Sequence, residues 1–150
     1  MGMIGRRATA TVFALLLLMA VSAGAQSAPW LVTAFTRDVN ADRVLPEYPR
    51  PQLERARWQS LNGQWDYAIR DRTSATPDTY DGNVLVPFPI ESRLSGVRRR
   101  VSPEQIVWYR RTFDVAAPAG DTRWLLHFGA VDWDATVFVN GTEVGTHRGG

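Results

Sequence analysis

From residue 64 onward the chain alternates apolar and polar side chains in short runs. In residues 64–70, Trp65, Tyr67 and Ile69 fall on one face of an extended segment. A period of two is typical of a strand with one buried face. Further short segments of this type occupy residues 84–86, 106–115, 123–128, 135–139 and 142–145, and no helical period of useful length follows residue 26. The sequence therefore predicts an all-β fold.

Turn signals separate these segments. Asn140-Gly141 is a strong hairpin signal between two apolar runs, because both central positions of a type I′ turn favour positive φ. Residues 118–121 predict another turn, and Pro87 stops the strand that begins at residue 84. Residues 91–105 read as a long polar loop. With 150 residues, a β-sandwich is the natural way to bury one face of each strand.

Residues 1–25 predict an export signal. Arg6 and Arg7 precede an apolar stretch of about 14 residues, and the small residues 23–25 match the pattern that signal peptidase cleaves. We expect cleavage after Ala25 and a periplasmic or extracellular protein without a stable membrane anchor. The alternative is an uncleaved anchor, but a membrane-spanning helix needs roughly 20 apolar residues.

The basic pI does not indicate a nucleic-acid partner. Without Arg6 and Arg7 the chain has 15 basic and 15 acidic residues, so the mature net charge is zero. The run of arginines at residues 98–100 is typical of a solvated loop. The absence of cysteine excludes disulfides and thiol nucleophiles, and two histidines make a His-rich metal site improbable on composition. We expect no cofactor and no metal.

Five groups of short strings, in order along residues 45–150, resemble the N-terminal sugar-binding-like domain of family 2 glycoside hydrolases, the β-galactosidase and β-glucuronidase type. They are LNGQW at 61–65, VPFPIES at 86–92 with LSGV at 94–97, WYRRTF at 108–113, LHFGAVDW at 126–133 with VFVNG at 137–141, and VGTHRGG at 144–150. The resemblance implies a jelly-roll (galactose-binding-like) β-sandwich over residues 55–150. Before it, the residues themselves predict the signal peptide at 1–25 and a proline-rich, extended arm over residues 26–54.

The resemblance also implies a retaining β-glycosidase that hydrolyses O-glycosidic bonds in carbohydrates. Such enzymes use two carboxyl groups roughly 5–5.5 Å apart. In the family both are glutamates of a later (β/α)8 barrel, and none of the five glutamates of this chain lies in a string that resembles those motifs. No catalytic residue is therefore assigned here. We expect the partners to be a β-glycoside, through the parent enzyme, and the protein's own later domains.

Two segments resemble family loops that approach the sugar site. Glu91, Ser92 and Arg93 are candidates for contacts to sugar or barrel, although a solvated or interdomain loop also explains them. His147 is a fourth candidate, and it can equally serve to hold its own loop. If Arg111 lies on the apolar face of its strand, we expect it to bond a carboxylate such as Asp132 or Asp134.

The strings stop at Gly150, inside the last motif. We therefore expect an incomplete sheet with an unpaired edge and exposed apolar surface, and poor solubility of residues 26–150 alone. Two other readings stay open at this level: a free-standing exported carbohydrate-binding (lectin-like) module, and an exported structural or adhesive sandwich that shares only the fold.

Overall fold

The computed structural model describes residues 33–149, so the predicted signal peptide at 1–25 and the first part of the predicted arm lie outside the described residues. Two short 3₁₀ helices, η1 (Ala34–Asp38) and η2 (Pro51–Leu53), precede the strands. The strands are β1 (Gly63–Asp71), β2 (Gly82–Val86), β3 (Gln105–Arg110), β4 (Asp134–Val139) and β5 (Thr142–Arg148). Within residues 33–149 we find no helix with the length and apolar character needed to cross a membrane.

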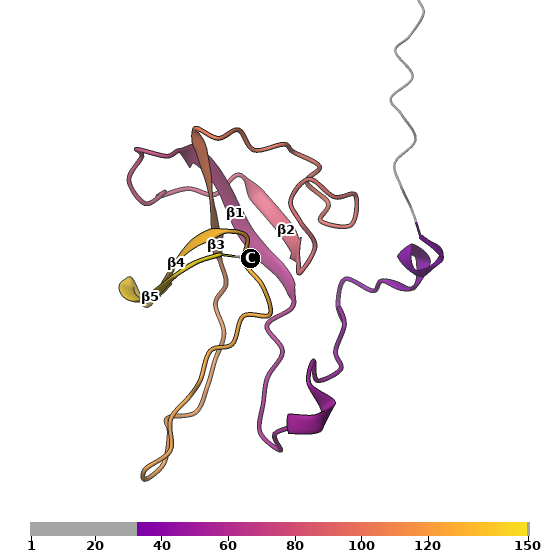
Figure 1. Ribbon diagram of the computed structural model, residues 1–150, viewed down its shortest axis with the longest axis vertical. Coiled ribbons are helices and arrows are strands. Elements are labelled where there is room, and N and C mark those ends of the chain that lie inside the picture. The colour runs from indigo at the N-terminus through magenta and orange to yellow at the C-terminus, as the bar shows by residue number, and fades with distance from the viewer. Residues whose placement is uncertain (1–32, 150) are drawn as a thin grey trace, which may run out of the picture.

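The strands form two antiparallel sheets (Figure 1), which confirms the all-β prediction. The first sheet has the order β2-β1-β3, with β1 in the centre, and the second is the hairpin β4-β5. The described part of the arm leads away from the sheet. The jelly-roll arrangement of a complete sandwich is not tested by these two sheets and stays a prediction.

One face of β1 carries the core. Tyr67 and Ile69 are buried there together with Val84 of β2, as the alternation predicted. Residues 87–104, which we call the long loop, fold over this face and add Ile90, Val97 and Val101 to the same cluster. Since a sheet face must be covered by another layer to keep water out, the long loop acts as that layer.

The opposite face of the same sheet meets the hairpin. Ala68 of β1 is fully buried and is paired with Trp108 of β3, whose ring lies 6.1 Å from the ring of Phe138 in β4. Tyr109, the next residue, points to the face that the long loop covers, because neighbouring strand residues alternate. The register therefore places Trp108 and Tyr109 on opposite faces of the sheet.

The β4-β5 hairpin has the predicted turn. Asn140 and Gly141 both have positive φ, 51° and 78°, as a type I′ turn requires. The register shifts between Val137 and Phe138, which leaves Val144 of β5 without a direct partner. At the open end, the backbone N–H of Gly149 donates to the carbonyl of Trp133 at 2.6 Å.

One strand prediction is wrong in part and another is wrong altogether. The strand predicted for residues 106–115 ends at Arg110, and residues 123–128 form no strand. The predicted turn at 118–121 is present, because Thr122 donates from its backbone N–H to the carbonyl of Ala119. Residues 111–133, which we call the excursion, run out from the sheet and back as two extended segments (Figure 1). The indole N–H of Trp124 joins these segments by donating to the carbonyl of Ala116. A pair of extended segments with no third strand beside it is marginal in water.

Exposed apolar side chains, which the sequence predicted, concentrate on this excursion and on the hairpin. Trp124 is 47% exposed, although large aromatic side chains gain most from burial. Others in the same region are Phe113, Val115, Leu125, Leu126, Phe128, Val131, Trp133, Phe138, Val139 and Val144.

The expected pairing of Arg111 with Asp132 or Asp134 is wrong. The Nη1 of Arg111 donates to the carbonyl of Gln64 at 2.9 Å, and Asp134 pairs with Arg148. The β1-β3 ladder ends at Asp66 opposite Arg110, so residue 111 has left the sheet and its side chain folds back over β1. Arg110, by contrast, forms an ion pair with Asp66 at 2.7 Å.

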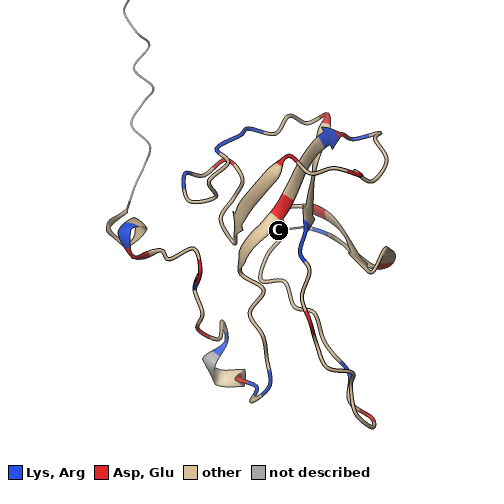
Figure 2. Cartoon of the chain, turned by 180° about the vertical axis from the view of Figure 1, so that it is seen from behind, with Lys and Arg blue, Asp and Glu red and all other residues tan. Residues whose placement is uncertain are grey.

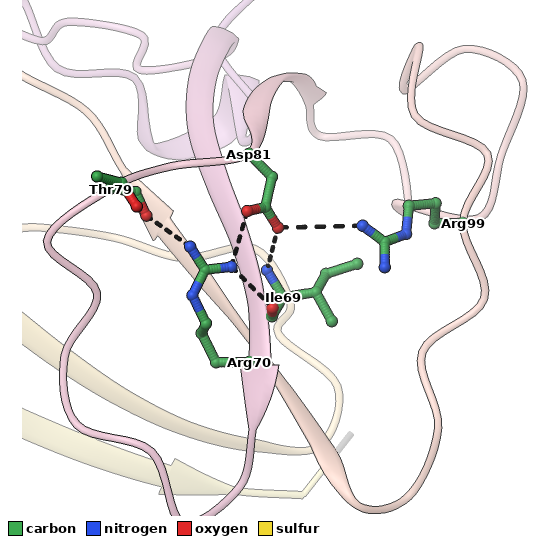
Figure 3. A network of polar contacts seen from close by, with 5 residues as sticks. All are labelled: Ile69, Arg70, Thr79, Asp81 and Arg99. Carbon is green, nitrogen blue, oxygen red and sulfur yellow. Dashed lines mark hydrogen bonds and ion pairs between the residues drawn. The ribbon is translucent and has the colours of Figure 1, made fainter.

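Asp81 extends the central strand pairing by means of its side chain (Figure 3). Strand β2 begins at Gly82, opposite Tyr67, so Ile69 has no backbone partner on that side. Asp81 Oδ2 accepts from the N–H of Ile69 at 2.9 Å, and Oδ1 accepts from Nη1 of Arg70 at 2.7 Å. These bonds, first that from Ile69 and then that from Arg70, lower the pKa of the Asp81 carboxyl.

We predict that Asp81→Ala lowers the free energy of unfolding by about 1–3 kcal/mol at pH 7, because the Ile69 N–H loses its acceptor. Since the folded-state pKa of Asp81 is lowered, its contribution is present above the unfolded pKa, about 4, and is lost as the pH falls through the lower folded value. Urea unfolding at pH 7 and at pH 3 measures both effects. Asp78→Ala, in the same loop, is the control; an equal loss there would contradict the assignment.

Candidate functional site

The candidate residues Glu91, Ser92 and Arg93 lie between two buried positions of the long loop. Ile90 is 3% exposed and Ser95 is 2% exposed. These two anchors hold the intervening residues at the surface of the loop. The structure thus gives the three candidates a fixed position beside β2, and they come from one continuous segment.

Ser95 organises this part of the loop. Its hydroxyl contacts the carbonyls of Ile90 and Ser92 at 3.0 and 2.8 Å and accepts from the N–H of Val97 at 3.1 Å. Its own carbonyl accepts from the N–H of Leu85 at 2.9 Å, which ties the loop to the outer side of β2. Buried polar groups need such partners. In the sequence, Ser95 is part of the LSGV string only, and a lone serine in a loop carries no signal of burial.

Ser92 serves the loop itself. Its hydroxyl accepts from the N–H of Ser95 at 3.2 Å, and its N–H donates to the carbonyl of Pro89 at 2.8 Å. The side chain is half-buried. These bonds give Ser92 a structural role in the loop; a contact to sugar stays a prediction.

Glu91 is exposed and lies close enough to Tyr109 to act on it electrostatically. Although 42% of Tyr109 is exposed, burial of its hydroxyl raises its pKa, and the negative charge of Glu91 adds to the rise. Tyr109 therefore stays neutral at physiological pH and can donate or accept a hydrogen bond beside a carboxylate. The alternation that places Tyr109 in a predicted strand gives no sign that it lies near the loop.

Arg93 faces the arm. Together with η1 it lines an open groove of about 530 Å³, whose other lining residues are Thr33, Ala34, Thr36 and Arg37. Two guanidinium groups and two hydroxyls make this groove a polar, cationic surface. Along the arm and the loops, basic and acidic residues are interspersed (Figure 2).

His147 lies away from the other three candidates. It is exposed on β5, opposite Ala135 of β4, and this hairpin meets the sheet on the face opposite the long loop. A Cβ on Gly149 would lie 3.8 Å from the Nε2 of His147, which is an ordinary van der Waals distance. The structure therefore does not bring His147 together with residues 91–93.

The acidic groups whose pKa is shifted are not suited to donate a proton. The pKa of Asp81 is lowered by the bonds described above. The pKa of Glu104 is lowered by the hydroxyl of Ser102 and by a backbone N–H. A glycosidase acid needs the opposite shift. Among residues 33–149 there is also no group of three or more His, Asp or Glu side chains that could hold a metal ion.

No protein-family model matches the chain. A curated relative, a β-glucuronidase of Paenibacillus borealis, is 26% identical over 109 residues. The aligned region covers 69% of this chain and 18% of the relative, so the chain spans less than a fifth of that protein's length. The chain is thus related, distantly and over part of its length, to a glycoside hydrolase.

We predict that Ser95→Ala opens the long loop. The N–H of Val97 and a loop carbonyl lose a buried partner, which costs about 1–3 kcal/mol. Limited trypsin digestion, followed by mass spectrometry, measures the opening at Arg93 and at residues 98–100, and we expect cleavage to be roughly fivefold or more faster. The control is Ser102→Ala, at an exposed serine; similar rates in both variants would contradict the role of Ser95.

Proposed function

We propose that this chain is the non-catalytic N-terminal β-sandwich of an exported retaining β-glycosidase of the family 2 type. The single observation that carries the proposal is the similarity to a β-glucuronidase over 109 residues. The antiparallel all-β architecture is consistent with it. Because the chain spans 18% of that relative, hydrolysis itself is assigned to residues outside these 150.

In this proposal the chain contributes residues to the edge of a sugar site and does not cleave the sugar. The long loop supports the positioning role, because Ile90 and Ser95 fix residues 91–93 at a defined place. Glu91 offers a carboxylate acceptor and Arg93 a donor, which are the groups that recognise sugar hydroxyls. Their partner is either the sugar or the catalytic domain, and β-glycosides are the proposed substrates of the parent enzyme.

Three chromogenic substrates test this function: a β-glucuronide, a β-galactoside and a β-mannoside. We expect no turnover by the 150-residue chain. We expect the full product of the gene to hydrolyse at least one of them with the β configuration retained in the first product seen by NMR. Turnover by the 150-residue chain alone would mean that it contains the catalytic groups, against the proposal. An inactive full product that binds simple sugars would favour a lectin-like module.

Export is a separate part of the proposal and rests on residues 1–25. We predict that a bacterial host releases a mature chain that begins at Gln26. Ala25→Phe should prevent cleavage, because signal peptidase requires a small residue before the cut, whereas Ala34→Phe should not. Cell fractionation and mass spectrometry of the N-terminus provide the measurement. A retained signal sequence in the unmodified chain would indicate the membrane anchor instead.

A further inference from the structure

Arg111 is a guanidinium with unused donors. Its Nη1 donates to the carbonyl of Gln64 at 2.9 Å, but its Nε is buried and has no hydrogen-bond partner in the structure. The group lies over Gly63: a Cβ on that glycine would be 3.1 Å from Nη1. The backbone thus holds the guanidinium in one place, while its Nε lacks an acceptor. A buried donor without a partner costs free energy and calls for an explanation.

The same arginine lines a pocket of about 210 Å³ between the arm and the start of β1. The pocket wall is held together by Asn62, whose Nδ2 donates to the carbonyls of Val44 and Leu45. A second guanidinium, that of Arg43, also lines it, and the remaining lining residues are Asp42, Val44, Pro46, Ser60 and Asn62. Two cations and one anion give the pocket a net positive charge.

The chain's own acidic side chains leave Arg111 unpaired. The ion pairs among residues 33–149 use Arg70, Arg99, Arg110 and Arg148. Asp42 lines the pocket, but it makes no ion pair with Arg111 or Arg43. Residues 1–32 contain neither Asp nor Glu. Residues 1–32 therefore supply no acidic side chain that could complete the pair.

We propose that this pocket binds the carboxylate of a small molecule, with Arg111 as the main donor and Arg43 as a second cation. A guanidinium can donate to a carboxylate from more than one of its nitrogens, and Arg111 brings its guanidinium to the lining of this pocket. The volume of about 210 Å³ is below the roughly 300–1,000 Å³ of pockets for drug-sized ligands. It suits a single acidic group on a compact molecule. This site does not depend on the function proposed above.

The test is an NMR titration of the full chain, labelled with ¹⁵N, that follows the Nε–Hε resonance of Arg111. D-Glucuronate and D-glucose are the matched probes, because they differ by a carboxylate in place of a hydroxymethyl group, and sodium chloride keeps the ionic strength constant. We expect a saturable shift with glucuronate and none with glucose. An equal response to acetate also supports the proposal, since the carboxylate is the group recognised.

Arg111→Gln should weaken glucuronate binding by roughly tenfold or more. Arg110→Gln is the control, because Arg110 pairs with Asp66 and does not line the pocket. If Arg111→Gln does not fold, Arg43→Gln replaces it and should weaken binding severalfold. Three results with the unmodified chain would overturn the proposal. They are the absence of a saturable shift, an equal shift with glucose, and binding that leaves the Arg111 resonance unmoved.

Discussion

The structure depends on covering one face of β1. Tyr67 and Ile69 project from that face, and the strand can hold them out of water only if another layer lies over them. The long loop, which has no strand of its own, provides that layer. A loop is a poor cover because its backbone polar groups need partners. The buried hydroxyl of Ser95 and the bond from Leu85 to its carbonyl meet this need, so apolar burial and polar satisfaction act in the same few residues.

This arrangement links the core to the candidate site. Ile90 belongs to the core cluster, and Glu91 is the next residue along the chain, so the position of its carboxylate follows from the packing beneath it. Glu91 also lies close enough to Tyr109 of β3 for its charge to add to the rise in the pKa of that tyrosine, which burial causes first. A substitution in the core would therefore shift the position of the Glu91 carboxylate without any change in residues 91–93.

The sequence pattern predicted the features of the fold that depend on neighbouring residues. The alternation in residues 64–70 located β1, and Asn140-Gly141 located the hairpin, because period and turn geometry are properties of neighbouring residues. The strand expected to reach residue 115 ended at Arg110, although β1 continues to Gly63, because beyond Asp66 the side chain of Arg111 bonds the carbonyl of Gln64 in place of a backbone partner. Pattern likewise could not show that Arg111 bonds a backbone carbonyl, that Ser95 is buried, or that His147 and the long loop lie on different faces. Each of these depends on which distant segments meet.

The hairpin β4-β5 is tied at both ends. The type I′ turn at Asn140 closes one end, and at the other Arg148 pairs with Asp134 and lies over the ring of Trp133 at 4.8 Å. Isolated hairpins usually fray from their open end. Here the irregularity in the pairing lies in the middle, at the register shift where Val144 has no direct partner. Local opening of the hairpin should therefore begin next to this bulge and not at its ends, and amide hydrogen exchange should be fastest there.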